Sequence, residues 1–396
     1  MSGSTARSIL VLNVGSSTLK FGVFPVAGGD DALLRGVLDH AGSSAGQLRT
    51  IDASGRSSSI PIRGAPGSAI GEVLRIAADQ LTGHRIEAVG HRLVHGGSTM
   101  RAPVRVDAVV RKGLEALVPL APEHLPAELR AIDEVSRYDA ALTQVACFDT
   151  AFHASLPTVA RLFGISRELS DSGVVRYGFH GLSYEYVTAL LRERGELPPR
   201  LIIAHLGNGA SLCAVRDGVS IDTSMGMTPT GGVVMSTRSG DLDPGVLLYL
   251  MRSRGLGRQQ LEDATDRSGG LLGISALSGD VRELLAAAPD NPRAREAIDI
   301  FCYKVRKFIG AYAAALGGLD ALVFVGGIGE HSAPIRGAIC GELGFLGVEL
   351  DAGLNNVSAP LISAATSRVR VRVEHTREDV MIARHVRALL AADARR

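Results

Sequence analysis

The sequence predicts an α/β protein built from two similar lobes, in which mixed β-sheets are flanked by helices. Two segments that lie almost half the chain apart support this prediction, Ser8–Pro25 and Arg200–Gly218. Each has an apolar strand that ends in a polar residue, a tight turn of small residues and a second strand. Because small residues let backbone N–H groups close on an anion, the two segments indicate related halves that face one phosphate-bearing ligand.

The first half of the chain is rich in strand patterns. Helical spacing and apolar runs there predict, in order, a hairpin over 8–14 and 20–26, loops between short strands over 42–68, a helix over 70–81, a strand over 88–94, a helix over 127–135 and a strand over 141–148. We place the main boundary at Asp149, so that residues 1–149 with 380–396 form an N-terminal lobe and residues 150–379 a C-terminal nucleotide-binding lobe.

The second half repeats this alternation of strands and helices. We expect a strand pair over 201–216, a long polar loop over 220–245, helices after Pro244 and over 294–316, a strand over 321–325, a glycine loop after it, a strand over 367–375 and a closing helix over 378–391. Mixing hairpins with strand–helix units is typical of mixed sheets in α/β domains.

Composition excludes several classes of partner. The 42 basic and 41 acidic residues leave a net charge of +1 without a block of like charge, so we expect neither nucleic acid nor a membrane surface as a partner. The most apolar stretch, 308–329, is interrupted at Gly317-Gly318-Leu319-Asp320 and is not expected to span a membrane. The four cysteines lie far apart, which favours a reducing cytoplasm.

The phosphate-binding pattern is not one of the common glycine motifs. No G-x-x-x-x-G-K-[ST] occurs, and the run after Val325 lacks the third glycine of the dinucleotide fingerprint. A two-lobed, nucleotide-dependent phosphotransferase remains, and its catalytic groups should be cations, a metal and positioning side chains. Candidates stand at strand ends and in glycine-rich turns: Asn13, Lys20, Arg92, His124, Asp149, His180, His205, Asn208, Arg238, Gly327 to His331, and Glu378.

Taken together, these residues resemble the acetate kinase family over nearly the whole chain. The resemblance rests on eight stretches in the same order: Asn13–Lys20, Gly90–Gly97, Phe148–His153, Arg176–Gly181, His205–Gly209, Asp222–Gly226, Thr237–Asp241 and Gly326–Glu330. It implies ATP-dependent, reversible phosphorylation of acetate to acetyl phosphate by direct in-line transfer. It also implies the ribonuclease H-like fold of actin, Hsp70 and the sugar kinases, with the active site in the cleft between the lobes, and a homodimer.

The same resemblance implies roles for individual side chains. Arg92 and Arg238 would flank the carboxylate and the γ-phosphate, and His180 would stabilise the transition state. Asp149 would align reactants and organise the metal, and His124 is a weaker candidate for positioning. The implied contacts to the carboxylate substrate come from Arg92, Val94, Phe179 and Pro229.

The resemblance implies two further sets of residues, one for the metal and one for ATP. Mg²⁺, or Mn²⁺, would lie near Asn13 and Glu378 and bridge the ATP phosphates. ATP would contact Lys20, His205, Leu206, Gly207, Asn208, Gly209, Asp280, Val281, Arg282, Gly327, Ile328, Gly329, Glu330 and His331.

Five positions depart from the family pattern. Glu123 stands where a leucine usually lines the acyl pocket, so the preferred carboxylate stays open between acetate and propionate, butyrate or another short acid. His331 replaces a common asparagine near the nucleotide and leaves the phosphoryl donor open. Tyr184, Gly231 and Ser236 replace a common histidine, glutamate and glycine. A sugar or polyol kinase and a non-enzymatic nucleotide switch of the same fold remain as alternatives.

Overall fold

The computed structural model describes residues 5–15, 18–39, 46–62 and 69–395. The chain divides into two compact units, the first made of 1–151 with 377–396 and the second of 152–376. The domain assignment made from the sequence, which divides the chain after residues 149 and 379, stays a prediction. None of the helices in the described ranges is both long and apolar enough to cross a membrane.

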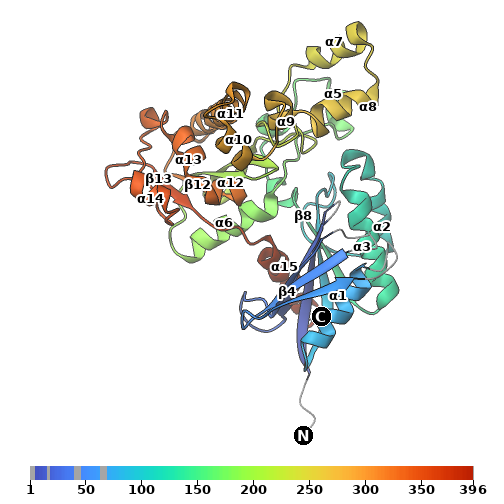
Figure 1. The fold of residues 1–396 in the computed structure, drawn as a ribbon. Coiled ribbons are helices and arrows are strands. Elements are labelled where there is room, and N and C mark those ends of the chain that lie inside the picture. The colour runs from blue at the N-terminus through green and yellow to red at the C-terminus, as the bar shows by residue number, and fades with distance from the viewer. Residues whose placement is uncertain (1–4, 16–17, 40–45, 63–68, 396) are drawn as a thin grey trace. The chain divides into compact units, whose positions relative to one another are not determined.

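The first unit is built on one mixed sheet of eight strands in the order β5-β4-β3-β2-β1-β6-β8-β7. Figure 1 labels β4 and β8 of this sheet. Strand β1 pairs antiparallel with β2 and parallel with β6, and β6 pairs parallel with β8. The strands of this unit are β1 (Ala6–Val14), β2 (Thr18–Pro25), β3 (Leu34–Asp39), β4 (Gly46–Asp52), β5 (Ser57–Ile62), β6 (His84–Leu93), β7 (Val104–Arg105) and β8 (Thr143–Phe148).

Helices cover both faces of this first sheet. Its helices are α1 (Ala69–Gln80), α2 (Ala108–Glu115), α3 (Leu125–Tyr138) and α15 (Glu378–Asp393). Val89 on β6 packs into a core with apolar residues of α1 and α3. The next residue, Gly90, faces the other way, where a Cβ atom would meet Ile382 and Val386 of α15, as the alternation of side chains along a strand requires.

The second unit contains a mixed sheet of five strands in the order β11-β10-β9-β12-β13. These strands are β9 (Arg200–Leu206), β10 (Ala210–Arg216), β11 (Val219–Thr223), β12 (Ala321–Val325) and β13 (Arg370–Val373). Strand β9 pairs antiparallel with β10 and parallel with β12, and β12 pairs parallel with β13. The order and the relative directions of these five strands therefore match those of β3-β2-β1-β6-β8 in the first unit. This match confirms the predicted duplication.

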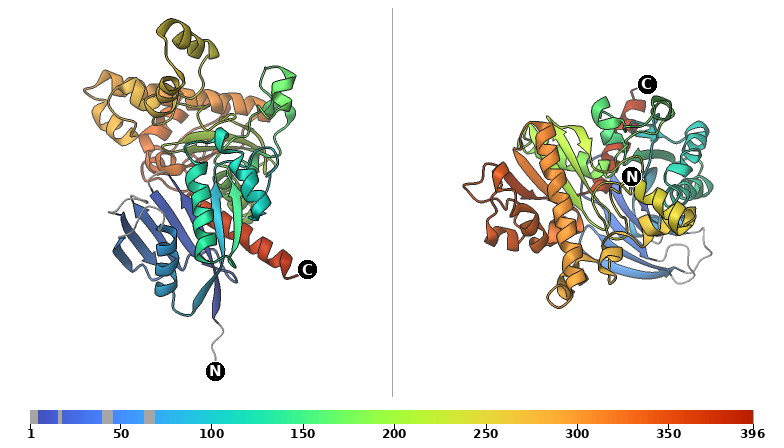
Figure 2. Two further views of the ribbon diagram at one scale, coloured as in Figure 1. Left: turned by 90° about the vertical axis from the view of Figure 1, so that its right-hand side faces the viewer. Right: turned by 90° about the horizontal axis from the view of Figure 1, so that it is seen from above.

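The second unit also carries most of the helices. They are α4 (Thr158–Arg161), α5 (Arg167–Asp171), α6 (Gly181–Glu193), α7 (Pro244–Arg254), α8 (Arg258–Glu262), α9 (Gly270–Ser275), α10 (Val281–Ala287), α11 (Pro292–Leu316), α12 (Gly326–His331), α13 (Ala333–Cys340) and α14 (Ala352–Asn356). The 25-residue helix α11 packs against β9 and β10 (Figure 2). Its ends follow from local sequence, since the Asn291 side chain caps the first turn and Gly317 ends the helix in the left-handed conformation.

Three expected elements differ in detail. The strand expected over 367–375 is limited to Arg370–Val373, because the adjacent strand β12 is only five residues long. The loop expected over 220–245 begins with the last residues of β11. The glycine loop after β12 is instead the short helix α12, in which a Glu330 carboxylate oxygen accepts a hydrogen bond from the Gly326 N–H at 3.0 Å. Of the stretch 42–68, residues 42–45 and 63–68 lie outside the described residues.

Candidate active site

The first unit places three predicted site residues around the guanidinium of a fourth, Arg92. Asn13, Arg92 and Asp149 stand at or just after the carboxyl ends of β1, β6 and β8. These three strands are parallel neighbours, so their ends meet at one edge of the sheet, where α/β proteins commonly bind ligands. Glu378 joins them as the first residue of α15.

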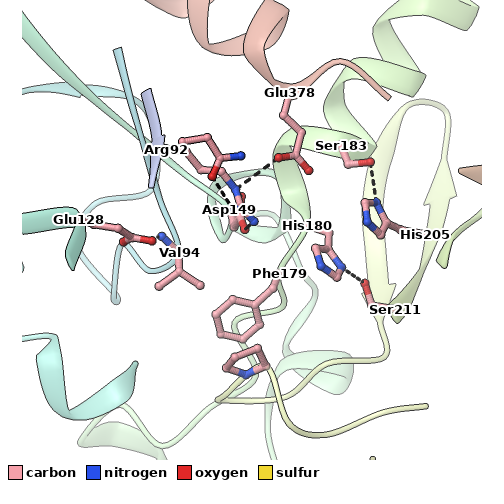
Figure 3. A network of polar contacts seen from close by, with 12 residues as sticks. Arg92, Val94, Glu128, Asp149, Phe179, His180, Ser183, His205, Ser211 and Glu378 are labelled. Atoms are coloured by element: carbon pink, nitrogen blue, oxygen red, sulfur yellow. Dashed lines mark hydrogen bonds and ion pairs between the residues drawn. The ribbon is translucent and has the colours of Figure 1, made fainter. Parts of the chain in front are cut away.

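Arg92 is held by the carboxylates of Asp149 and Glu378 (Figure 3) and by the side-chain amide of Asn13. Its Nε and Nη2 donate to the two carboxylate oxygens of Asp149 at 3.1 and 2.5 Å, and its Nη1 donates to Asn13 Oδ1 at 3.2 Å. Glu378 Oε2 lies 3.3 Å from Arg92 Nε. The Arg92 side chain is 22% exposed and Asp149 only 1%, so the guanidinium is fixed in place and still reaches solvent.

Electrostatics at this cluster follow from burial and from close charges. Burial lowers the pKa of Arg92, but the neighbouring carboxylates of Asp149 and Glu378 outweigh this effect, and the pKa is raised. Burial, with a contribution from the Glu378 charge, raises the pKa of Asp149 despite the attraction of Arg92. The guanidinium therefore stays charged, and Asp149 serves as a bidentate anchor for it.

Glu128 is a further residue at this cluster that the sequence reasoning missed. Its side chain, on α3, is buried, and its Oε2 accepts a hydrogen bond from the backbone N–H of Val94 at 3.1 Å. Burial raises the pKa of Glu128 to about 8, although the Val94 N–H and the charge of Arg92 oppose this shift. Leu125, Leu129 and Ile132 lie on the same buried face of α3, so an acid on an apolar helical stripe was a usable signal.

Two other predicted residues lie near the start of α3. His124 directly precedes the helix and is half-buried. Glu123, the departure expected to matter for the acyl pocket, is exposed. Lys20 is also exposed, and it pairs with Asn13 across the β1–β2 hairpin, which puts the two side chains on the same face of the sheet.

In the second unit, His180 and His205 form a stacked pair of imidazoles. The ring centroids lie 4.1 Å apart with an interplanar angle of 14°. His180 Nδ1 lies 2.8 Å from Ser211 Oγ, and His205 Nδ1 lies 2.9 Å from Ser183 Oγ (Figure 3). His180 precedes α6 with φ of 57°, a left-handed conformation that costs a non-glycine residue about 1–3 kcal/mol and often marks a functional site.

Arg238 and His180 converge over Gly209, in the turn between β9 and β10. A Cβ atom at Gly209 would lie 3.4 Å from His180 Nε2 and 3.6 Å from Arg238 Nη1. Arg238 Nη1 also donates to the carbonyl of Pro229 at 3.2 Å. Both nitrogens therefore lie within van der Waals reach of the position that a Cβ atom at residue 209 would occupy. Phe179, next to His180, is 1% exposed, and its carbonyl lies 3.0 Å from His153 Nε2.

The predicted nucleotide residues fall into two groups. The turn after β9 and helix α12 after β12 lie at the same edge of the sheet, because β9 and β12 are parallel neighbours. A Cβ atom at Gly326 would lie 2.7 Å from the Leu206 carbonyl, so only glycine allows this approach. This edge gathers His205, Leu206, Gly207, Asn208, Gly209, Gly327, Ile328, Gly329, Glu330 and His331.

Glu330 and the second nucleotide group have local partners. Besides Gly326, Glu330 pairs with His375 through an Oε2–Nδ1 contact of 2.5 Å. Asp280 caps helix α10, whose first residue is Val281, and its carboxylate pairs with Arg282 at 2.5 Å. The two charges of that pair thus compensate each other.

Two of the departures from the family pattern, Ser236 and Gly231, can be explained by their surroundings in this unit. The Ser236 N–H donates to the Asn208 carbonyl at 3.1 Å, and its hydroxyl donates to the Gly279 carbonyl at 2.6 Å. Ser236 therefore ties the β9–β10 turn to the segment that begins α10. A Cβ atom at Gly231 would lie 3.3 Å from Asp241 Oδ1, which disfavours an acidic residue there.

Comparisons with known proteins agree on one family. The acetokinase family profile matches residues 8–384. Over 391 residues the chain is 43% identical to an acetate kinase of Rhodopseudomonas palustris, covering 96% of this chain and 97% of that protein. It is 40% identical to a propionate kinase of Citrobacter rodentium, with 98% of each covered. The acetate kinase structure from Porphyromonas gingivalis superimposes on this chain with a TM-score of 0.88 at 36% sequence identity. The match covers 97% of this chain and 100% of that structure.

Proposed function

The chain belongs to the acetokinase family, and from this premise we propose that it transfers the γ-phosphoryl group of ATP to acetate. The products are acetyl phosphate and ADP, and the reaction is reversible. The observation that carries the proposal is the fixed, partly exposed guanidinium of Arg92, held by Asp149, Glu378 and Asn13. A planar cation of this kind suits a carboxylate or a phosphoryl oxygen, both of which are negatively charged. A sugar hydroxyl is neutral and does not require such a cation.

Direct in-line transfer asks mainly for positioning and for stabilisation of charge. In our proposal, Arg92 orients the acetate carboxylate. His180 and Arg238 donate hydrogen bonds to oxygens of the phosphoryl group in the transition state. Asp149 acts by holding Arg92, since the acetate carboxylate is already ionised near neutral pH and needs no base. The convergence of His180 Nε2 and Arg238 Nη1 over Gly209 supports this division of roles. His124 is assigned a lesser role in positioning the acceptor.

Mg²⁺, or Mn²⁺, is the proposed metal, with Asn13 and Glu378 as its nearest protein groups. Both offer oxygen atoms, the donor type that these hard cations prefer, and both contact Arg92. One or two protein ligands are enough for Mg²⁺, because it retains waters and binds the substrate phosphates. Bound there, the metal would neutralise charge on the ATP phosphates.

ATP is the proposed co-substrate, with its phosphates on the glycine-rich edge of the second sheet. Lys20 and residues His205 to Gly209 would contact the phosphates, and residues Gly327 to His331 the nucleotide beside them. The segment Asp280 to Arg282 is proposed to meet the adenosine. The close approach of Gly326 to the Leu206 carbonyl supports this assignment, because both segments then present backbone rather than side chains.

The acyl chain is proposed to contact Val94, Phe179 and Pro229. Acetate is the first choice, and propionate or butyrate is the alternative, because relatives of similar identity include both acetate and propionate kinases. The exposure of Glu123 favours an unchanged apolar pocket. A hydroxamate assay with Mg-ATP and acetate, propionate or butyrate tests the proposal. Acetate should give the highest kcat/KM, and acyl phosphate from none of the three acids would refute it.

A coupled assay of ADP release separates the remaining alternatives. An acyl kinase releases ADP only when a carboxylate is added, a sugar kinase when a polyol is added, and a nucleotide switch without dependence on either. Carboxylate-dependent release at a rate equal to hydroxamate formation is the expected result. Release that responds to sugars and not to acetate would favour the sugar kinase alternative.

We further propose a homodimer in a reducing cytoplasm. Apolar side chains on and beside α7 are at least two-fifths exposed, namely Leu242, Val246, Leu248, Tyr249 and Met251. A patch of this kind is typical of an interface with another protein surface, and a second copy is our proposed occupant. The four cysteines are free and buried, which suits a reducing compartment. Light scattering should give twice the 41.5 kDa chain mass, and Leu248→Glu should return the protein to a monomer.

A further inference from the structure

The imidazole of His180 belongs to a chain of three hydrogen-bonded side chains. Tyr184 Oη lies 2.5 Å from Ser211 Oγ, and Ser211 Oγ lies 2.8 Å from His180 Nδ1. Tyr184 and Ser211 are both 0% exposed. Tyr184 stands one turn after His180 on α6, and Ser211 stands on β10, so helix and strand together fix the imidazole plane. His153 packs edge-on against the Tyr184 ring, 5.5 Å between centroids.

The chemistry of the two hydroxyl groups sets the direction of this chain. A phenol is a stronger acid than an aliphatic alcohol, so it is the better donor and the poorer acceptor. The favoured arrangement has Tyr184 O–H donating to Ser211 Oγ, and Ser211 O–H donating to His180 Nδ1. A nitrogen that accepts a hydrogen bond carries no proton, and the neutral imidazole then carries its proton on Nε2.

That proton points to the position where the transferred group is proposed to lie. A Cβ atom at Gly209 would lie 3.4 Å from His180 Nε2 and 3.6 Å from Arg238 Nη1, so the two nitrogens lie beside one position over this glycine. Two N–H donors directed at one space can stabilise an oxygen that gains negative charge in the transition state. The opposite tautomer would present a lone pair there and repel the same oxygen.

We propose that Tyr184 and Ser211 are positioning residues that hold His180 as its Nε2–H tautomer, so that it donates to a phosphoryl oxygen over Gly209. This inference rests on the proposed phosphoryl transfer, and it gives a role to Tyr184, one of the departures from the family pattern. The relay supplies a neutral donor, which adds no second positive charge beside Arg238 and against the stacked ring of His205.

Imidazole ¹⁵N NMR of the full-length protein without substrates tests the tautomer directly. Two-bond ¹H–¹⁵N correlation spectra distinguish the two tautomers, and His180→Gln assigns the signal among the 11 histidines. We expect the Nε2–H pattern for His180 in the wild type. Tyr184→Phe and Ser211→Ala should convert it to a mixture of tautomers. A wild-type Nδ1–H pattern, or variants that leave the pattern unchanged, would overturn the proposal.

Kinetics of the same variants test the consequence for catalysis. Loss of one oriented donor should lower kcat about tenfold in Tyr184→Phe and about 10²-fold in Ser211→Ala, with both KM values within about twofold of wild type. Tyr177→Phe is the matched control, because its hydroxyl donates to the Gly173 carbonyl at 3.0 Å and takes no part in the relay. It should lose similar stability and retain both the tautomer and kcat.

The two readouts separate this inference from the proposed function. If the tautomer responds to the variants and no carboxylate is phosphorylated, the relay stands and the proposed reaction fails. If acetate is phosphorylated and the tautomer does not respond, the reaction stands and the relay fails. Should Tyr184→Phe not fold, the wild-type spectrum and Ser211→Ala still decide the question.

Discussion

Replacing Glu128 with glutamine should make the protein more stable at neutral pH and leave its stability almost unchanged in acid. The Glu128 carboxyl is buried and accepts a hydrogen bond from the Val94 N–H. Glutamine retains an oxygen acceptor for that N–H and resembles the neutral acid in shape. The change therefore removes mainly the ability of this position to ionise.

The size and sign of the effect follow from the two pKa values. Burial raises the Glu128 pKa from 4.5 to about 8 in the folded protein. Below pH 4.5 the Glu128 carboxyl holds its proton in both the folded and the unfolded protein. The wild type is therefore no less stable there than Glu128→Gln. As the pH rises from 4.5 toward 8, the unfolded chain releases its proton and the folded chain retains it, so wild-type stability falls. At pH 7 the free energy of unfolding of the wild type is lowered by about 3 kcal/mol, because each pH unit contributes 1.36 kcal/mol.

Thermal unfolding without nucleotide and in the presence of EDTA, from pH 5 to pH 8, measures this difference. The midpoint of Glu128→Gln should exceed that of the wild type by a margin that grows to several degrees with rising pH. Glu115→Gln is the control, because the Glu115 side chain is 71% exposed, and its difference from wild type should stay flat. A Glu128→Gln difference that is the same at pH 5 and pH 7.5 would show that this carboxyl is ionised in the folded protein.

Three further substitutions test the second unit. Arg238→Ala should abolish turnover with an unchanged circular dichroism spectrum, and wild-type kinetics in this variant would refute the site assignment. Gly209→Ala should lower kcat at least tenfold with unfolding little changed, because its Cβ would fill the space faced by His180 Nε2 and Arg238 Nη1; an unaltered kcat would show that nothing reactive lies there. Gly310→Ala, in the interior of α11 with open space around it, should stabilise the protein by about 0.5–1 kcal/mol in denaturant unfolding and leave kcat unchanged.

Hydrophobic periodicity predicted the main elements because burial and local spacing agree in them. The first hairpin, the helix expected over 70–81 and the strand expected over 321–325 all lie within about two residues of β1–β2, α1 and β12. Elements that depend on a distant partner were less predictable. Strand β13 pairs with β12, which is distant in the sequence, so its bounds are not visible in a local window. Helix α12 is a different case, because the contact of Glu330 with the Gly326 N–H is local and the glycines at its start are typical of a loop.

The candidate site shows the same division between local and distant information. Strand ends and glycine turns pointed to Asn13, Arg92, Asp149 and Glu378, and the structure brings these four together. The sequence could not show that Asp149 binds Arg92 through both oxygens, because 57 residues separate them. Pairing of side chains across strands depends on register, which local spacing does not fix.

Glu128 and Ser211, which the sequence reasoning missed, and Tyr184, noted there only as a departure, have one property in common. Each is polar, each is buried among apolar neighbours, and each bonds a site residue or another member of the relay rather than solvent. A buried polar group without a partner costs about 1–3 kcal/mol, so such a residue is tolerated where its partner is fixed. In an α/β kinase, a polar side chain on the apolar face of an element beside a catalytic motif therefore indicates a residue that positions the motif. Substituting it should change kcat through the orientation of its partner, which separates this role from direct contact with the substrate.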